Sequence, residues 1–443
     1  MVNKVVNKTT EINDYKTIGE DLLGMNKPTR VLVLFQNNAE SRPGGGFIGT
    51  VAYLSIDKGK INPEPVRSVY WYDYQIGEIR DALKSEGQDV SNYDYTLRDS
   101  GQSLDWTTNA KAAKKLFELQ PGKDVDVVVG ITPEVLKYFL RQTGPVKLDE
   151  YNKTISSDNI IETLQQEVES GQDKAQGKDP KTVISSVANV LISRLSQKNL
   201  SELSELGAGL KDLASQRQIS IYSKEYTAGE SLNKHNLDGA LVKFESDYFL
   251  LSENNISVDK SNAFIDRKLN RSVTINNEGK INIEATITRT QTIPESFPYV
   301  DPKVPDIVTH LVRKNVSQIN IAVPSGSKIL STAGNLTLTP AGKEQGYDVY
   351  SFISSLDPLV ASEYRIIYEL PYNLGGEYGV AYNSYLQLQN GGWPYQLSMT
   401  VQTPNNWEFS ASNNKDVIIE AQSVLYNGNI DRDFYLSLIY AKN

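Results

Sequence analysis

Residues 30–50 read RVLVLFQNNAESRPGGGFIGT, and this stretch is the clearest indication of the fold. Its first part, Arg30–Phe35, is a continuous apolar run bounded by turn-forming residues, which is typical of a strand buried on both faces of a sheet. Its second part, Asn37–Thr50, is rich in glycine and leads into an apolar strand predicted over Phe47–Ile56. The stretch therefore predicts a sheet whose first strand ends in a glycine-rich loop.

Helical patterns on both sides of this stretch indicate the α/β class. Asn3–Leu23 has apolar residues at helical spacing and ends at Gly24, so a lead-in helix is expected there. Downstream, a helix over Thr108–Leu119, a buried strand over Val125–Ile131 and a helix over Thr132–Gln142 follow in order. Strands that alternate with helices are the pattern of an α/β sheet.

Further segments complete the predicted α/β region. They are a strand over Ile61–Tyr70, helices over Ser157–Glu169, Thr182–Leu195 and Leu200–Leu213, and a strand over Ile219–Tyr222. Gly171–Lys181 contains almost no apolar residue and is predicted to be a mobile loop.

From about Ala263 onward the hydrophobic period changes from 3.6 to two. Short alternating stretches, such as Ile281–Thr288 and Tyr364–Leu370, lie between Gly, Pro and Asn turns, which predicts a β-sandwich. The predicted organisation is a lead-in helix over residues 1–25, an α/β domain over residues 26–255 and an all-β sandwich domain over residues 256–443.

The composition excludes several classes of function. The chain carries 45 Lys and Arg against 54 Asp and Glu, a net charge of -9 with no basic stripe, so no nucleic-acid partner is expected. It has no Cys, which excludes thiolate nucleophiles and Cys-ligated metals. Its two histidines, His235 and His310, lie far apart without spaced partners, so both are interpreted as packed or exposed residues.

Two interpretations of the glycine-rich loop are open. In the first, backbone N–H groups of the three consecutive glycines cradle an anion such as pyrophosphate, and the Arg42 guanidinium adds a forked cation. The residues of this candidate anion site are Asn38, Glu40, Arg42, Gly44, Gly45 and Gly46. In the second, the loop is only a connection, and its polar side chains satisfy the backbone groups of turns.

A second polar constellation precedes the helix predicted from Thr108. Arg98 and Asp99, followed by Asp105, could together hold a phosphate and a hydrated Mg²⁺, with Asp99 and Asp105 as metal ligands. The alternative is a surface ion pair between Arg98 and Asp99, with Asp105 as the first residue of a helix. If the first interpretation holds, Arg42 and the glycine loop should lie beside Arg98 and Asp99, because ligands collect where strand ends open into a crevice.

Residues 70–74, Tyr-Trp-Tyr-Asp-Tyr, form an aromatic patch. Aromatic faces next to an acid suit carbohydrate, so the patch could stack on a sugar. The alternative is a strand end that packs under a helix, in which alternation buries half of these rings.

These motifs resemble an uncharacterised bacterial cell-surface family, domain of unknown function 4012. The segments that carry the resemblance are Leu22–Gly24, Arg30–Gln36, residues 37–50, Lys58–Ile61, Leu97–Asp99, Asp105–Trp106, Val125–Val129, Thr143–Val146, Lys260–Ser261, Phe264–Arg267 and Tyr364–Pro371, which extend over nearly the whole chain. The sequence departs from the family pattern at Ser41–Gly46 and Ser103–Thr107, but Arg42 and Asp105 are retained in these two motifs.

The resemblance implies a location and a function. Members of the family carry a membrane helix ahead of the segment that aligns with Met1, so we expect a membrane-anchored protein on the extracytoplasmic face of a bacterial membrane. The order of strand, Arg-Asp loop, helix, buried strand and Gly-Pro-Val turn also resembles the LytR-CpsA-Psr enzymes, which transfer polyprenyl-pyrophosphate-linked glycopolymers to the cell wall.

Two functions are therefore weighed for this chain. In the first, it binds or transfers a pyrophosphate-lipid-linked glycopolymer or a cell-wall glycan by Mg²⁺-dependent phosphotransfer, with Arg42, Arg98 and Asp99 as the catalytic residues. In the second, it is a non-catalytic adhesion or scaffolding module of the cell surface.

Overall fold

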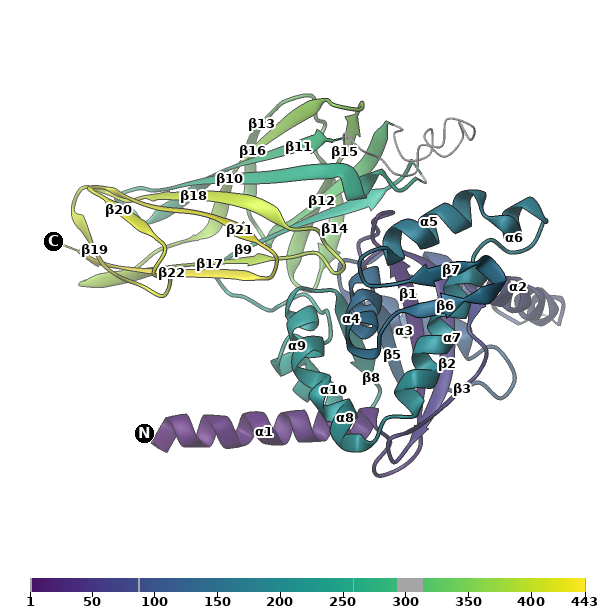
Figure 1. Ribbon diagram of the computed structural model, residues 1–443. Helices are drawn as coiled ribbons and strands as arrows, with labels where there is room; N and C mark the ends of the chain where they lie inside the picture. The colour runs from purple at the N-terminus through teal and green to yellow at the C-terminus, as the bar shows by residue number, and fades with distance from the viewer. Residues whose placement is uncertain (1, 87, 258, 293–313, 443) are drawn as a thin grey trace. The chain divides into compact units, whose positions relative to one another are not determined.

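The computed structural model describes residues 2–442 apart from residues 87, 258 and 293–313. The described residues form two compact units. The first contains residues 2–38 and 42–240, and the second contains residues 39–41, 241–292 and 314–442. The predicted α/β region and β-rich region are both confirmed (Figure 1).

The first unit is built on a mixed sheet whose described strands follow the order β3-β2-β1-β5-β8, with β4 paired to β2. These strands are β1 (Thr29–Asn37), β2 (Phe47–Asp57), β3 (Lys60–Pro63), β4 (Arg67–Ser68), β5 (Val127–Ile131) and β8 (Ile219–Ser223). The central strand β1 is parallel to β5 and antiparallel to β2. The short strands β6 (Val146–Leu148) and β7 (Lys153–Ile155) form a separate pair.

Helices cover both faces of this sheet, which gives three layers (Figure 1). On one face, α2 (Val69–Ser85) and α3 (Trp106–Phe117) pack against Leu32, Leu34 and Val128. The other face, which carries Phe35 and Val129, is covered by α4 (Pro133–Thr143), α5 (Ile160–Ser170), α7 (Thr182–Ser196) and α9 (Gly207–Ser215). Alternate residues of β1 and β5 thus serve opposite cores, as expected for strands buried on both faces.

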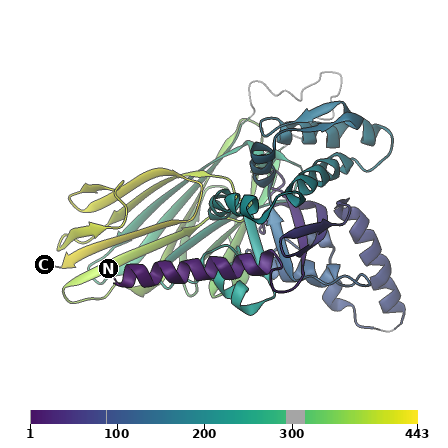
Figure 2. The same ribbon diagram turned by 60° about the horizontal axis from the view of Figure 1, so that its bottom comes forward.

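The lead-in helix is confirmed as α1 (Val2–Leu22), and Gly24, two residues after its end, has a backbone φ of 61°. It contacts α10 (Tyr226–Lys234), as Figures 1 and 2 show. His235, just after α10, stacks on Tyr15 at 4.6 Å between ring centroids and lies 3.0 Å from Asp14. The interpretation of His235 as a packed residue is confirmed, whereas His310 lies outside the described residues.

An ion-pair cluster links the start of β1 to the residue that precedes β5. The buried carboxylate of Asp126 accepts hydrogen bonds from the backbone N–H and the guanidinium of Arg30, both at 2.8 Å, and pairs with Lys224 at 2.5 Å. Burial alone would raise the pKa of Asp126, but these bonds and charges outweigh burial and hold its pKa well below the usual value.

The second unit consists of two described seven-stranded sheets that enclose one hydrophobic core. One sheet has the order β13 (Lys328–Ala333), β16 (Ala361–Asn373), β11 (Lys280–Gln291), β10 (Ile265–Ile275), β18 (Tyr395–Gln402), β21 (Ser423–Ile430) and β20 (Ile418–Glu420). The other has the order β14 (Thr339–Glu344), β15 (Tyr347–Leu356), β12 (Asn315–Pro324), β9 (Asp247–Asn255), β17 (Gly379–Gln387), β22 (Phe434–Lys442) and β19 (Trp407–Ser412). Burial in β10 alternates strictly, which confirms the period of two.

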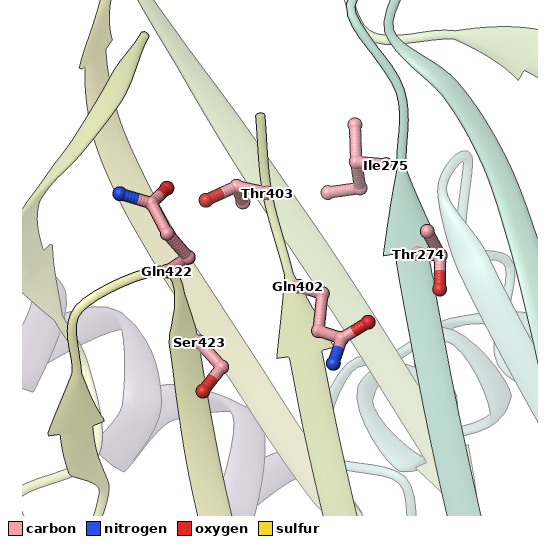
Figure 3. A pocket seen from close by; sticks show the side chains of 6 residues that line it. All are labelled: Thr274, Ile275, Gln402, Thr403, Gln422 and Ser423. Atoms are coloured by element: carbon pink, nitrogen blue, oxygen red, sulfur yellow. The ribbon is translucent and has the colours of Figure 1, made fainter. Parts of the chain in front are cut away.

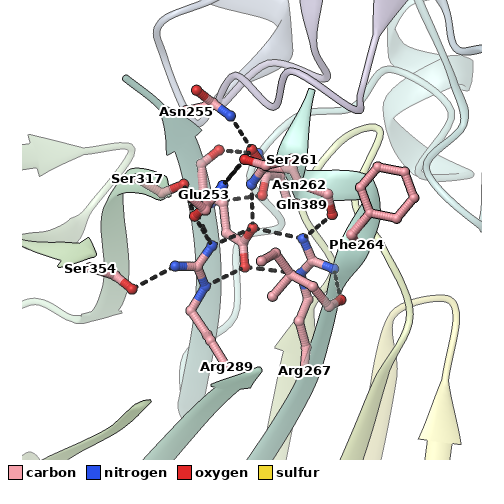
Figure 4. Close-up of polar contacts among 12 residues, drawn as sticks. Glu253, Asn255, Ser261, Asn262, Phe264, Arg267, Arg289, Ser317, Ser354 and Gln389 are labelled. Atoms are coloured by element: carbon pink, nitrogen blue, oxygen red, sulfur yellow. Dashed lines mark hydrogen bonds and ion pairs between the residues drawn. The ribbon is translucent and has the colours of Figure 1, made fainter. Parts of the chain in front are cut away.

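A buried polar network lies within the second unit (Figure 4). Glu253 accepts hydrogen bonds from Arg267 at 2.9 Å, from Arg289 at 3.1 Å and from the Asn262 amide at 2.7 Å. Burial would raise the pKa of Glu253, but the charges of the two arginines outweigh burial and hold its pKa well below the usual value.

The structure corrects the predicted domain boundary. The sequence assigned residues 241–255 to the α/β domain, whereas β9 is a central strand of the second unit and pairs with β12 and β17. The physical reason is that Tyr248–Leu250 is a continuous buried run, so β9 lacks the alternation that identified the later strands.

Three other predicted elements differ from the structure. The strand expected over Ile61–Tyr70 ends at Pro63, and α2 begins at Val69. The segment Gly171–Lys181, predicted as a mobile loop, contains the short helix α6 (Gln172–Ala175), and its Asp173 accepts a hydrogen bond from Tyr151 at 2.5 Å. The helix expected over Leu200–Leu213 is divided into α8 (Leu200–Glu205) and α9.

Candidate functional site

The glycine-rich loop after β1 is buried, and its backbone already has partners within the protein. The Gly44 N–H donates to the Gly101 carbonyl at 3.0 Å, and the Gly45 N–H donates to the Arg42 carbonyl at 3.0 Å. The Gly44 carbonyl accepts a hydrogen bond from the Gln36 amide at 2.8 Å. The expected cradle of free N–H groups is therefore wrong for Gly44 and Gly45, and for these two residues the loop acts as a connection.

Close packing explains why three glycines occur here. A Cβ at Gly44 would lie 2.2 Å from the Asn109 amide nitrogen, and a Cβ at Gly46 would lie 2.5 Å from the backbone of Asn37. Gly45 has a φ of 131°, which side-chain-bearing residues rarely adopt. The glycines let the loop lie directly on its neighbours.

The loop is joined to the second predicted constellation. The Gly44–Gly101 hydrogen bond places the glycine loop against the turn that follows the short helix η2 (Leu97–Asp99). The predicted proximity of the glycine loop to the Arg98–Asp99 segment is confirmed by this bond.

Three cationic side chains surround two aromatic rings beside this junction. The Arg42 guanidinium carbon lies 5.6 Å from the centroid of Phe47, and Lys181 Nζ lies 4.6 Å from the same ring. Lys181 Nζ also lies 4.4 Å from the centroid of Tyr70, and the Arg98 guanidinium carbon lies 5.2 Å from it. We call Arg42, Phe47, Tyr70, Arg98 and Lys181 the cation–aromatic cluster. Each contact is within the range of a cation–π interaction.

The members of the cluster differ in their exposure to solvent. Arg42 is only 8% exposed, and Lys181 Nζ is buried. Tyr70 is 48% exposed, and about a third of the Arg98 side chain is exposed. A ligand in solution therefore reaches Arg98 and Tyr70 first, whereas Arg42 and Lys181 contribute mainly through their positive charge.

Lys181 is the member that the sequence analysis missed. It is the N-cap residue of α7, and its backbone N–H donates to Asp179 at 2.9 Å. Its side chain approaches β2 at Gly49, where an added Cβ would lie 3.4 Å from Nζ. No local pattern connects Lys181 with Arg42, because the two are brought together only by the packing of α7 on the sheet.

Two carboxylates flank Arg98. Its guanidinium lies 3.6 Å from Asp73 and 3.7 Å from Asp99, and Asp73 accepts a hydrogen bond from the Leu97 N–H at 2.6 Å. Burial raises the pKa of Asp73 above its usual value, against the opposing effects of the Leu97 hydrogen bond and the Arg98 charge. The ion pair between Arg98 and Asp99 is confirmed.

Asp105 serves as the N-cap of α3. Its Oδ1 accepts hydrogen bonds from the Thr108 N–H at 2.9 Å, the Thr108 hydroxyl at 3.1 Å and the Thr107 hydroxyl at 2.5 Å. This confirms the interpretation of Asp105 as a helix-start residue.

The predicted magnesium ligands do not fit a metal site as they are arranged. Asp99 accepts a hydrogen bond from Thr96 and pairs with Arg98, and Asp105 is occupied in capping. The described part of the chain contains no group of three or more His, Cys, Asp or Glu side chains that could hold a metal ion. We therefore derive no step through Mg²⁺.

The other two predicted ligand residues lie near the start of the loop. Asn38 and Glu40 are both buried. The segment that contains Glu40 is part of the second unit, because the Asn262 N–H donates to the Ala39 carbonyl and the Asn255 N–H donates to the Ser41 carbonyl. Glu40 thus belongs to the second unit, whereas the cation–aromatic cluster belongs to the first.

The aromatic patch lies in the first two turns of α2 rather than at a strand end. Tyr72 is buried between Val69 and Ile76 on the inner side of the helix. Tyr70 and Trp71 are exposed, and Tyr74 is 69% exposed. The strand-end interpretation is wrong, because the period of 3.6 turns three of the four rings away from the core.

A separate cavity of about 260 Å³ lies in the second unit (Figure 3). One lining residue is apolar, and the other five are polar and uncharged. The lining consists of Thr274, Ile275, Gln402, Thr403, Gln422 and Ser423. The lining offers no acid, base or nucleophile pair for chemistry.

Comparisons with known proteins give a family match for part of the chain but no function. No curated protein matches the chain. Among solved structures, an M1 zinc metallopeptidase from Deinococcus radiodurans is 13% identical, with 40% of this chain and 42% of that chain covered and a TM-score of 0.23. The leukotriene A4 hydrolase of Saccharomyces cerevisiae is 6% identical, with 42% of this chain and 30% of that chain covered and a TM-score of 0.24. Scores this low indicate neither a shared overall fold nor a shared function.

Two findings bear on the predicted family and its anchor. Among the helices of the described residues, none combines the length and the apolar character that a membrane crossing requires. Residues 26–168 match the family described as "Protein of unknown function (DUF4012)", which confirms the predicted resemblance over this part of the chain.

Proposed function

We propose that the α/β unit binds a phosphate-bearing glycan or a polyprenyl pyrophosphate at the cation–aromatic cluster. The observation that carries the proposal is that Arg42, Arg98 and Lys181, from three distant segments, gather around Phe47 and Tyr70. Like charges repel, and gathering them in a partly buried place is unfavourable unless anions compensate them. A phosphate at this place would be attracted by all three cations.

Arg98 is the residue that would contact the ligand. Its guanidinium is partly exposed and presents several N–H donors in a planar fork that matches two phosphate oxygens. Arg42 and Lys181 are largely buried and would raise the local positive potential.

The proposed setting follows from the resemblances. We place the protein on the extracytoplasmic face of a bacterial membrane, held by an anchor, with a cell-wall glycan or a pyrophosphate-linked lipid as its ligand. The likeness in element order to the LytR-CpsA-Psr enzymes supports this ligand class. Neither phosphotransfer nor a metal requirement is part of the proposal, because the arrangement of Asp99 and Asp105 does not favour a metal site.

The test is calorimetric titration of the protein with inorganic pyrophosphate and farnesyl pyrophosphate, each with and without Mg²⁺. We expect Arg98→Ala to weaken binding about tenfold to a hundredfold, since a charged hydrogen bond contributes roughly 1.5–3 kcal/mol. Arg141→Ala, at an exposed position on α4, is the matched control and should leave binding unchanged. Absence of pyrophosphate binding under all four conditions would remove the proposal.

A further variant separates the anion site from a metal site. Asp99→Asn removes a negative charge next to Arg98 and should tighten pyrophosphate binding. If Asp99 instead held Mg²⁺, the same substitution would weaken binding and abolish any dependence on the metal.

A non-catalytic scaffolding role is the second candidate. The observation that favours it is the internal use of the Gly44 and Gly45 N–H groups, which leaves these groups occupied within the loop. In that case the cluster only braces the loop and α2 against α7, and Arg98→Ala would lower stability while pyrophosphate binding is absent in both proteins.

A further inference from the structure

We infer that Tyr70, Trp71 and Tyr74 form a sugar-binding face that recognises the sugar next to the phosphate. We call these three residues the aromatic face. The inference rests on the proposed function and deepens it, because it specifies a sugar phosphate rather than a free phosphate or an unsubstituted lipid pyrophosphate as the ligand.

The first step is that the core does not require these rings. The inner side of α2 buries Val69, Tyr72 and Ile76, while Tyr70, Trp71 and Tyr74 are 48%, 39% and 69% exposed. Tyr70 and Trp71 lie four and three residues before Tyr74 in the same helix, so both are neighbours of Tyr74 on the helix surface. Such surfaces mark binding sites more often than isolated exposed side chains do.

The second step is that the aromatic face is bordered by arginines. The Arg67 guanidinium carbon lies 4.3 Å from the centroid of Trp71, and that of Arg98 lies 5.2 Å from Tyr70. Of the nearby acids, Asp73 pairs with Arg98. Charge complementarity therefore favours an anionic occupant, which a neutral glycan is not.

The third step is continuity with the cation–aromatic cluster. Tyr70 belongs to both, because its ring contacts Lys181 and Arg98, and Trp71 is its neighbour in the chain. A phosphate at Arg98 would thus place an attached sugar next to the exposed rings. The C–H face of a sugar packs on an aromatic ring, while the hydroxyls of tyrosine can hydrogen-bond its oxygens.

The experiment compares ligands that differ only in the sugar. Inorganic pyrophosphate, farnesyl pyrophosphate and a farnesyl pyrophosphate that carries one N-acetylglucosamine are titrated into the intact protein by calorimetry. We expect the sugar to tighten binding. Trp71→Ala and Tyr74→Ala should each lower the affinity for the glycosylated ligand, and for that ligand alone, by about twofold to tenfold. Binding of inorganic pyrophosphate should be the same in both variants and the unmodified protein.

Tyr226→Ala is the matched control. Tyr226 is also highly exposed on a helix of the same unit, and its hydroxyl bonds Glu230 four residues on, as the Tyr74 hydroxyl bonds Glu78. It lies outside the aromatic face, so its loss should change no affinity. Circular dichroism and thermal unfolding confirm that each variant is folded.

Tryptophan fluorescence gives an independent signal. Trp106 and Trp407 are buried, whereas Trp71 is exposed. The glycosylated ligand should change the emission of the unmodified protein, and Trp71→Phe should abolish this change while retaining most of the affinity, because a ring is still present.

The outcomes distinguish this inference from the proposed function. If inorganic pyrophosphate binds but the sugar adds no affinity, the aromatic face is not a sugar site and the proposed function stands. If no pyrophosphate binds at all, the proposed function fails, and the inference fails with it. Trp71-dependent binding to vesicles of an anionic phospholipid, with no preference for the glycosylated ligand, would show a membrane-contact surface and overturn the inference.

Discussion

At the scale of single residues, buried carboxylates compensate the charges of buried arginines in the second unit. Glu253 compensates two buried arginines, Arg267 and Arg289, and Asp247 pairs with Arg271 at 2.8 Å with both side chains fully buried. A buried ion pair is not necessarily stabilising compared with an apolar pair, but removing one partner leaves an uncompensated charge and costs about 3–5 kcal/mol. Such residues are therefore the points where a single substitution has the largest effect.

Glu253→Gln should destabilise the second unit by about 3–5 kcal/mol at pH 7. The pKa of Glu253 is lowered on folding, so the stability from its charge is complete above the unfolded pKa of about 4.3 and is lost as pH falls toward the folded pKa. The difference in free energy of unfolding between the variant and the unmodified protein should therefore become smaller as the pH falls below about 4. Urea unfolding at pH 7 and at pH 3.5 measures the free energy of unfolding of both proteins. A difference that stays the same at the two pH values would contradict the lowered pKa of Glu253.

Single residues also show the limit of the sequence analysis. The adjacency of the glycine loop and the Arg98 segment was predicted, but the reason given holds only for the glycine loop, which follows β1, because the Arg98 segment follows the helix α2. The place of Lys181 in the cation–aromatic cluster could not be predicted, because it depends on how α7 packs on β2, and no local spacing in the sequence indicates this packing. The same holds for the backbone partners of Gly44 and Gly45, which are distant or depend on the conformation of the turn.

At the scale of elements, the residues at helix starts explain why α4 was predicted correctly and why the start of α2 was predicted as a strand. The helix α4 has Thr132 as its N-cap and Pro133 at its first position, a strong start signal, and the helix predicted over Thr132–Gln142 is confirmed. The helix α2 begins with Val-Tyr-Trp-Tyr, and such aromatic and β-branched residues favour strands, so the sequence was interpreted as a strand. Packing of Tyr72 and Ile76 in the core outweighed that local preference.

The start of α3 provides a test of the role of Asp105. Asp105→Ala removes the cap and should lower the free energy of unfolding by about 0.5–2 kcal/mol, whereas Asp105→Ser keeps a capping oxygen and should lower it much less. Thermal or urea unfolding measures both variants. If Asp105 were a metal ligand, serine would not replace it, and Asp105→Ser and Asp105→Ala would lose Mg²⁺-dependent ligand binding equally.

At the scale of the whole molecule, the class of each unit was predictable, whereas the boundary between them was not. The change of period near residue 263 identified the β-rich region, and the strict alternation of β10 shows why that signal was clear. The strand β9 is buried on both faces in the middle of its sheet, and such a strand has the same continuous apolar pattern as β1 in the α/β unit. A pattern common to both classes cannot assign a strand to either.

The corrected boundary predicts which fragment of the chain folds. A fragment of residues 256–443 lacks β9 and so loses both Asp247 and Glu253, which leaves Arg271, Arg267 and Arg289 buried without their carboxylates. At about 3–5 kcal/mol for each uncompensated charge, the loss is as large as the 5–15 kcal/mol that stabilises an ordinary domain. A fragment of residues 241–443 keeps β9 and, within the second unit, loses the contacts of residues 39–41, such as the Asn255–Ser41 backbone bond. We therefore expect cooperative thermal unfolding, followed by circular dichroism, for the fragment of residues 241–443 and none for the fragment of residues 256–443. A cooperative transition of the shorter fragment at a similar temperature would show that β9 is dispensable and that the earlier boundary at residue 255 is the functional one.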